Sequence, residues 1–325
     1  MQHNATANAT TAAQGKPRNP GPLSGRDCLT LAEFSPQETD LILSEAAKLK
    51  TLRRSRIPFQ PLRGKTLAMV FQKPSNRTRV SFEVGMYNLG GHALHLSPEE
   101  IQMGKRETPS DTGRVLARYI DAIMVRTFDH GELEELAAAA DVPVINGLSD
   151  DHHPCQGLAD LLTLREEFGR LEGLKVAYIG DGNNVAHSLA VGCALTGAHL
   201  TIAHPEGHAP NPGVVELARS LGAAPTLTSD PRKAAEDAHA LYADVWASMG
   251  QESEAEDRKA EFAPYQVNSD LMDLANDQAI FLHCLPAHRG EEVTEEVIDG
   301  LQSRVFDQAE NRLHAQKALL YLLLG

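Results

Sequence analysis

The residues best suited to chemistry form one cationic, hydroxyl-rich stretch, Ser75 to Arg79, which reads Ser-Asn-Arg-Thr-Arg. It follows the apolar run 65–71, which predicts a buried strand, and precedes 80–89, whose apolar spacing predicts a helix. Ser75 suits an N-cap, so the free N–H groups of the first helical turn would point back over the strand end. Together with Arg77 and Arg79, these groups would bind a compact dianion, and phosphate fits best.

Three further residues are expected on the same rim. Arg126 ends a predicted strand, where it could hold an anion or a carbonyl oxygen. His153 and Gln156 follow another strand and open a helix; His153 can donate to a carbonyl, and Gln156 can recognise an amide through its oxygen and its nitrogen. Taken alone, His153 would be read as a helix-capping histidine, and only its neighbours favour a functional role.

The second half of the chain offers its own candidates. Asp244 ends a predicted strand and is well placed to bind an ammonium group, and Cys284 lies at the end of another predicted strand, near Pro286. Taken alone, Cys284 fits the commoner case of a buried, inert cysteine. The stretch 180–184, Gly-Asp-Gly-Asn-Asn, lacks the spacing of a dinucleotide fingerprint and suits a carboxylate or amide ligand better. The stretch 310–312, Glu-Asn-Arg, is predicted to cap the terminal helix and to bring Arg312 to the rim.

The elements that must position these residues alternate between short apolar runs and helical patterns. Strands are predicted at 65–71, 91–96, 122–126, 142–146, 174–179, 199–203, 240–245 and 280–285, with a short extended piece at 304–306. Helices are predicted from Ser35 and Ser75, at 111–119, 131–140, 154–168, 184–197 and 214–221, and at the C-terminus. This alternation indicates the α/β class, with two doubly wound parallel-sheet domains joined by interdomain helices and a cleft between them.

The domain boundaries follow from this order. We expect a disordered arm at 1–24, a first domain at 25–153, a second domain at 154–310, and a C-terminal helix at 311–325 that packs back on the first domain. Residues 154–168 form the interdomain helix. The polar loop 97–108 is a candidate lid or interface loop.

Composition narrows the range of partners. The formal net charge of −14, with no basic tail, argues against nucleic acid, although a local arginine cluster still allows a small anion. The four cysteines, Cys28, Cys155, Cys193 and Cys284, form no C-x-x-C pair, which fits a reducing compartment, so we expect a cytoplasmic protein. No apolar run approaches the roughly 18 residues that a membrane span needs.

Four stretches together resemble one family, the aspartate/ornithine carbamoyltransferases. They are 75–79, 153–156 (His-Pro-Cys-Gln), 244–250 (Asp-Val-Trp-Ala-Ser-Met-Gly) and 283–286 (His-Cys-Leu-Pro), in the family order. Asn76 departs from the threonine usual in the family, but its amide remains a donor. The resemblance implies a carbamoyl-phosphate domain at 25–153, an amino-acid domain at 154–310, and a homotrimer or a multiple of trimers.

The resemblance also implies the substrate-binding residues. Those for carbamoyl phosphate are Ser75, Asn76, Arg77, Thr78, Gln102 (which would reach a neighbouring subunit's site), Arg126, His153, Gln156, Leu285 and Arg312. Those for the amino acid are Asn184, Asp244, Ser248, Met249 and Cys284. Arg126, His153, Asp244 and Cys284 would act catalytically, and neither a cofactor nor a metal is implied.

The reaction implied is the transfer of the carbamoyl group of carbamoyl phosphate to the side-chain amine of L-ornithine, which gives L-citrulline and phosphate, as in arginine biosynthesis. Cys284, Asp244 or the phosphate itself could accept the proton of the amine. Three alternatives stay open: another acceptor (aspartate, putrescine or N-acetylornithine), a nicotinamide-dependent dehydrogenase using 180–184, and a non-enzymatic anion-binding or scaffold protein.

Overall fold

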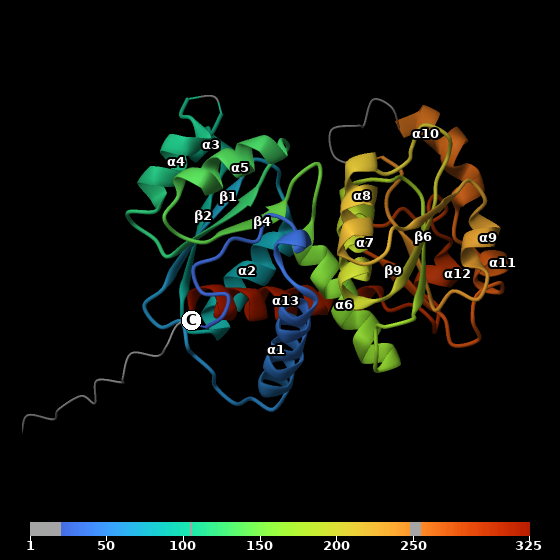
Figure 1. Ribbon diagram of the computed structural model, residues 1–325, viewed down its shortest axis with the longest axis horizontal. Helices are drawn as coiled ribbons and strands as arrows, with labels where there is room; N and C mark the ends of the chain where they lie inside the picture. The colour runs from blue at the N-terminus through green and yellow to red at the C-terminus, as the bar shows by residue number, and fades with distance from the viewer. Residues whose placement is uncertain (1–20, 105, 248–254) are drawn as a thin grey trace, which may run out of the picture.

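The computed structural model describes residues 21–104, 106–247 and 255–325. The described strands form two parallel sheets that lie side by side in Figure 1. The first sheet has the order β2-β1-β3-β4 and consists of β1 (Thr66–Phe71), β2 (His92–Leu96), β3 (Ala122–Arg126) and β4 (Val144–Leu148). The second has the order β7-β6-β5-β8-β9 and consists of β5 (Lys175–Ile179), β6 (His199–Ala203), β7 (Thr226–Thr228), β8 (Ala240–Ala243) and β9 (Ile280–His283).

Helices cover both faces of each sheet (Figure 1). In the first half they are α1 (Pro36–Arg54), α2 (Asn76–Asn88), α3 (Pro98–Ile101), α4 (Pro109–Leu116) and α5 (His130–Ala139). In the second half they are α7 (Asn184–Thr196), α8 (Pro212–Leu221), α9 (Pro231–Ala235), α10 (Ala255–Phe262), α11 (Ser269–Met272) and α12 (Glu295–Ile298). Two single 3-10 turns, Leu31–Glu33 and Ala263–Tyr265, complete these halves.

The central strands are apolar along their whole length because both of their faces are buried. In β5, Val176 and Tyr178 belong to one core cluster, whereas Ala177 and Ile179 belong to a second cluster on the opposite face. Such strands lack the alternation of polar and apolar residues that is typical of a sheet with one face exposed to solvent. The sequence therefore shows them as short continuous apolar runs.

Both sheets reverse their strand order at an interior position, between β1 and β3 in the first and between β5 and β8 in the second. In doubly wound sheets the loops on either side of such a reversal diverge and leave a crevice at the carboxyl ends of the strands. Ligand-binding residues are therefore expected directly after these four strands.

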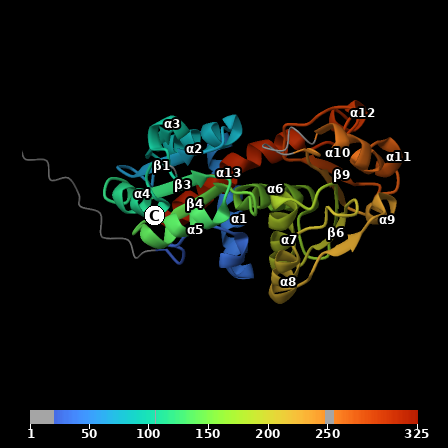
Figure 2. The same ribbon diagram turned by 90° about the horizontal axis from the view of Figure 1, so that it is seen from above.

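Two long helices join the halves. α6 (Pro154–Phe168) crosses between the sheets, and α13 (Val305–Leu324) runs from the second half back beneath the first, where the C-terminus lies (Figure 2). α13 packs against α1, α2 and α6. A buried polar contact fixes this junction: Lys50 Nζ lies 2.7 Å from Glu166 Oε2 and 2.7 Å from Asn311 Oδ1.

Three expectations need correction. The piece predicted as extended at 304–306 begins α13, with Arg304 as its N-cap, so the stretch 310–312 lies inside the helix and does not cap it. The fourth strand runs from Val144 to Leu148, not 142–146, because Pro143 precedes it and cannot donate to the ladder. Residues 21–24 are part of the fold, since Leu23 is fully buried; residues 1–20 lie outside the described residues.

Within the described ranges, no helix combines the length and the apolar character that crossing a membrane would require.

Candidate active site

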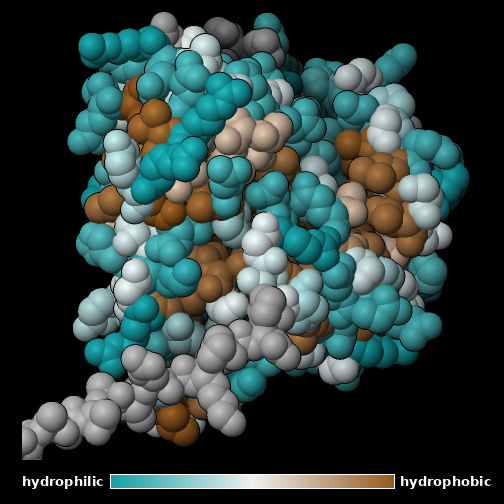
Figure 3. Space-filling view, turned by 60° about the vertical axis from the view of Figure 1, so that its left-hand side comes forward, coloured by the Kyte–Doolittle hydropathy of each residue, from teal (hydrophilic) through white to brown (hydrophobic). Residues whose placement is uncertain are grey.

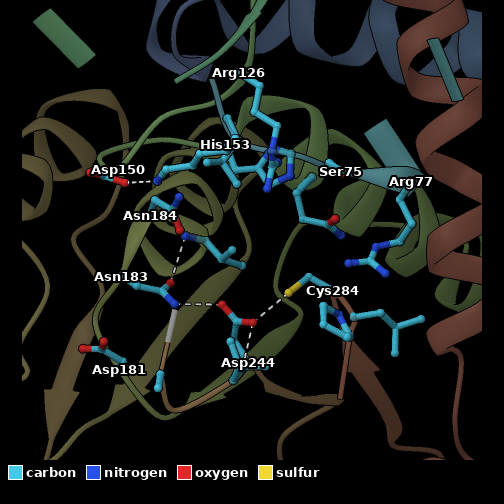
Figure 4. Close-up of a pocket in the computed structure, with 18 of the residues that line it drawn as sticks. Ser75, Arg77, Arg126, Asp150, His153, Asp181, Asn183, Asn184, Asp244 and Cys284 are labelled. Carbon is cyan, nitrogen blue, oxygen red and sulfur yellow. Dashed lines mark hydrogen bonds and ion pairs between the residues drawn. The ribbon is translucent and has the colours of Figure 1, made fainter. Parts of the chain in front are cut away.

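A cavity of about 940 Å³ lies between the two sheets, at the carboxyl ends of the strands on either side of both reversals. Figure 4 shows side chains from the two halves pointing toward one another across it. Most residues expected to bind ligand line this cavity: Ser75, Asn76, Arg77, Arg126, His153, Gln156, Asn184, Asp244, Cys284, Leu285 and Arg312. The tertiary structure thus gathers residues that are up to 237 positions apart in the chain (75 to 312).

The corner between β1 and α2 has the predicted form. Ser75 is the N-cap of α2, and its Oγ accepts a hydrogen bond from the backbone N–H of Thr78 at 3.2 Å. Arg77 lines the cavity, but Arg79 points away and pairs with Glu83 at 2.9 Å. The side chains of residues i and i+2 of a helix point in directions about 200° apart. Arg77 and Arg79 therefore cannot face the same ligand.

Arg77 is instead accompanied by two arginines from distant segments, Arg126 at the end of β3 and Arg312 on α13. Burial, and then the charges of Arg312 and Arg77, lower the pKa of Arg126 to about 9. Burial also lowers the pKa of Arg312. Concentrating positive charge in a buried place costs free energy, and an anionic ligand would recover part of that cost.

His153 is held in one tautomer by Arg312. Arg312 Nη1 lies 3.1 Å from His153 Nε2, and a guanidinium can only donate, so Nε2 accepts and Nδ1 carries the proton. Burial, followed by the nearby arginine charges, lowers the pKa of His153 well below its ordinary value. A neutral imidazole with a protonated Nδ1 is a hydrogen-bond donor suited to a carbonyl oxygen.

Gln156 is also fixed in orientation. Its Nε2 donates to Asp160 Oδ1 at 2.7 Å, and its Oε1 accepts from Arg312 Nη1 at 3.1 Å. One N–H of Nε2 is thus engaged with Asp160 and one lone pair of Oε1 with Arg312, which leaves a second donor and a second acceptor site on the same amide. Asp160 is fully buried, and burial raises its pKa to about 7.

The opposite wall of the cavity presents a carboxylate, Asp244, at the end of β8. Its Oδ2 accepts from Asn183 Nδ2 at 2.7 Å, and its Oδ1 accepts from the Cys284 thiol at 2.9 Å and from the Val245 N–H at 2.8 Å. Figure 4 shows this arrangement. All three described partners are neutral, so no described residue pairs with Asp244 as a cation.

The Cys284 thiol acts here as a donor and not as a base. Burial, and then the charge of Asp244 and its hydrogen bond, raise the pKa of Cys284 well above its ordinary value. Donor atoms of Asp244, His283 and Cys284 lie within 4.8 Å of one another, a spacing that a metal ion could use. However, His283 Nδ1 accepts from the Leu285 N–H and its Nε2 bonds to Glu292, so neither imidazole nitrogen is available as a ligand.

The remaining predicted residues have different positions. Asn184 lines the cavity, with its amide donating to the Ser149 carbonyl at 2.6 Å. Gln102 is exposed at the end of α3 and does not line the cavity of its own chain. Ser248 and Met249 lie outside the described residues.

Several cavity residues were given no individual role from the sequence, although the stretch 180–184, which contains Asn183, was expected to suit a carboxylate or amide ligand. Asn183 is the N-cap of α7 and the residue that contacts Asp244; its place directly after β5 and before a helix was the available signal. Lys73, buried, pairs with Asp150 and lies 4.0 Å from the centre of the Phe128 ring. No local pattern in the sequence could indicate this contact between three separate loops.

The start of α7 is not free to bind a pyrophosphate in the way of a dinucleotide fold. Asn183 Oδ1 already accepts from the N–H groups of Val185 and Ala186, at 2.9 and 3.2 Å. A dinucleotide-binding turn leaves such groups for the ligand.

The fold and the cavity together define a class: a two-domain α/β protein whose cleft separates a wall that carries three arginines from a wall that carries a carboxylate. Two family models match the chain, the carbamoyl-P binding domain of aspartate/ornithine carbamoyltransferase over residues 26–166 and the Asp/Orn binding domain over residues 172–323. The chain belongs to the aspartate/ornithine carbamoyltransferase family.

Individual relatives agree over nearly the full length. The ornithine carbamoyltransferase of Anoxybacillus flavithermus is 58% identical over 306 residues, covering 93% of this chain and 98% of that protein. The Bacillus subtilis enzyme of the same name is 55% identical over 307 residues, covering 93% of this chain and 95% of that protein. Among solved structures, ornithine carbamoyltransferase from Pyrococcus furiosus has a TM-score of 0.91 at 54% identity, covering 93% of this chain and 98% of that chain.

Proposed function

We propose that this chain transfers the carbamoyl group of carbamoyl phosphate to the side-chain amine of L-ornithine and releases L-citrulline and phosphate. The observation that carries the proposal is the division of one cavity into a wall of Arg77, Arg126 and Arg312 and a wall of Asp244, Asn183 and Cys284. A dianionic donor and an amino acid with a cationic group match these two walls in charge. The names of relatives that are more than half identical support the same reaction.

The phosphate of the donor would lie over the start of α2. The N–H groups there and the guanidinium of Arg77 would bind it, with Ser75 and Asn76 as further donors. Thr78 would act indirectly, because its side chain is buried and accepts from Arg312 Nη2 at 2.9 Å. These groups would stabilise the negative charge that grows on the phosphate as the C–O bond breaks.

The carbamoyl group would lie between Arg126, His153 and Gln156. Arg126 and the Nδ1–H of His153 would donate to the carbonyl oxygen, where negative charge develops as the amine attacks the carbon. Gln156 Oε1 would accept from the carbamoyl amide, together with the backbone carbonyl of Leu285. Such preorganised donors typically contribute roughly 3–4 kcal/mol each to lowering the barrier.

The amino acid would lie against the second wall. Asp244, with Asn184, Ser248 and the backbone of Met249, would hold its α-ammonium and carboxylate groups, and Cys284 would lie beside the side-chain amine. An amine of this kind has a pKa of about 10.4, so it must lose a proton before it can attack. Because the Cys284 thiol stays protonated, the proton would pass to Asp244 or to the departing phosphate.

We further propose the biological setting. The first half (25–153) would be the carbamoyl-phosphate domain and the second (154–310) the ornithine domain, and three copies would form a homotrimer in which Gln102 reaches a neighbour's cavity. The face seen in Figure 3 has hydrophobic patches among hydrophilic side chains. In the first half, the apolar side chains of Val80 and Leu94 are 49% and 40% exposed. The free, dispersed cysteines fit a cytoplasmic location.

The decisive experiment is a citrulline assay with carbamoyl phosphate and four rival acceptors: ornithine, aspartate, putrescine and N-acetylornithine. We expect turnover with ornithine and at least roughly 100-fold lower kcat/KM with the others, since losing a partner for a buried polar group costs several kcal/mol. Preference for another acceptor would overturn the ornithine assignment. Binding of carbamoyl phosphate without any turnover would favour an anion-binding protein instead.

A further inference from the structure

The loop after β9 carries a backbone conformation that needs support. Leu285 lines the cavity and has φ = 58°, in the left-handed region that side chains other than glycine rarely adopt. Such a residue persists only where its surroundings hold it, and it is typical of ligand-binding loops. The question is which groups hold Leu285.

The contact that restrains Leu285 comes from the last residue of β9. The Leu285 N–H donates to His283 Nδ1 at 2.9 Å. His283 is fully buried, and its own backbone N–H donates to Gln308 Oε1 of α13 at 2.9 Å. With its N–H engaged, Leu285 can offer a ligand only its carbonyl oxygen.

This contact requires one tautomer of His283. Nδ1 can accept from Leu285 only if it carries no proton, so the proton must be on Nε2. Nε2 lies 3.2 Å from Glu292 Oε1, a carboxylate oxygen that can only accept from it. The same oxygen accepts from the backbone N–H of His288 at 2.6 Å. Both ends of the loop 283–288 are therefore bonded to the Glu292 carboxylate.

Glu292 is unusual because its side chain is fully buried. The charged and titratable groups nearest to it are His283, His288, whose Nδ1 lies 3.7 Å from Glu292 Oε2, and Glu291, whose carboxylate lies within 4.8 Å. Among the described residues, Glu292 has no arginine or lysine partner, and burying such a carboxylate costs free energy. An apolar side chain at the same position would avoid this cost if the residue served only the packing of the fold.

We propose that Glu292 is a positioning residue: it holds His283 in the Nε2–H tautomer, so that His283 fixes Leu285 in its left-handed conformation with the carbonyl oxygen facing the carbamoyl group. Glu292 touches no substrate and acts through His283 and the Leu285 backbone. The inference rests on the proposed function, because it assigns the Leu285 carbonyl to the carbamoyl amide.

The test compares Glu292→Leu with Glu292→Gln, and uses Glu291→Gln as the matched control. Glu291 is the neighbouring residue, but it pairs with Lys259 at 3.1 Å and does not line the cavity. Glutamine keeps one acceptor oxygen, and in this structure Glu292 uses a single oxygen for both bonds. We therefore expect Glu292→Gln to restore most of the activity that Glu292→Leu loses.

The expected result is a split between the two substrates. In the citrulline assay, Glu292→Leu should lower kcat/KM for carbamoyl phosphate at least roughly tenfold, the effect of removing one well-placed hydrogen bond, while KM for ornithine changes less than about threefold. Equal losses for both substrates, or wild-type kinetics in Glu292→Leu, would overturn the proposal. If the wild type itself makes no citrulline, the proposed function fails, and with it the role given to the Leu285 carbonyl; the tautomer of His283 is then decided by the measurement below.

A second measurement covers the case in which Glu292→Leu does not fold. Imidazole ¹⁵N spectra of the histidine-labelled wild type, with His283 assigned by its loss in His283→Asn, report the tautomer directly. The Nε2–H form supports the proposal, and the Nδ1–H form or a doubly protonated ring overturns it.

Discussion

Arg312 on the first wall of the cavity and Asp244 on the second carry opposite charges, but the described contacts of both are to neutral groups. On the first, Arg312 contacts the neutral groups of Thr78, His153 and Gln156. On the second, the described residues that donate to Asp244 are Asn183, Cys284 and Val245, which are all neutral. The interdomain junction differs, because there the buried Lys50 pairs directly with Glu166.

The difference separates a structural charge from a functional one. A charge paired inside the protein is neutralised and contributes little to binding, whereas a charge held by dipoles keeps its field for a ligand. Under the proposed function, Arg312 and Asp244 would therefore act on a dianion and an ammonium group, whereas Lys50 at the junction would not.

Removing a charge from the first wall should have the largest effect. In Arg77→Ala, kcat should fall roughly 100- to 1,000-fold, because a preorganised donor to the developing negative charge is lost. The matched control is Arg79→Ala, whose exposed ion pair with Glu83 lies outside the cavity, and it should stay within about twofold of the wild type. Steady-state citrulline assays check both, and comparable losses in the two variants would contradict the assignment of the anion wall.

Neutralising the second wall should act mainly on the amino acid. In Asp244→Asn, KM for ornithine should rise roughly 10- to 100-fold, because a charge-assisted hydrogen bond is replaced by a neutral one. KM for carbamoyl phosphate serves as the internal control and should change less than about threefold. A parallel rise in both KM values would mean that the two walls do not divide the substrates.

Replacing the thiol should have a smaller effect. Cys284→Ser preserves a donor to Asp244 Oδ1, so kcat should stay within roughly tenfold of the wild type. Its pH profile should lack any step from a thiolate. If the thiolate were the base, serine would abolish turnover, since its hydroxyl does not ionise near neutral pH.

The smallest effect concerns stability and not turnover. The pKa of Asp160 is raised to about 7 in the folded chain, against an ordinary value of about 3.9. The folded state therefore binds more protons than the unfolded state between these pH values, and this carboxyl makes the free energy of unfolding fall as pH rises from about 4 to about 7. Asp160→Asn should remove this contribution and flatten the slope in denaturant titrations. An unchanged slope would contradict the raised pKa.

The sequence alone determined much of this protein. The apolar runs and cap residues predicted most of the strands and helices, and they placed Ser75, Arg126 and Asp244 at strand ends, because strand burial and helix starts depend on residues close in the chain. The resemblance to the family was carried by four short stretches, and the matching family models confirm it. The described elements that the sequence did not predict are β7, α3 and α9 to α12, which are too short to leave a clear periodic signal.

Only the tertiary structure decided which side chains meet. It turned Arg79 away from the cavity and brought Arg126 and Arg312, which the sequence had already placed on the rim, to Arg77. It also joined Asn183 to Asp244 and fixed the tautomer of His153. The physical reason is that local spacing sets where a strand ends and a helix begins, whereas convergence at one cavity depends on strand order and on the return of α13 beneath the first sheet. Those depend on burial between segments far apart in the chain, and no short window of sequence records them.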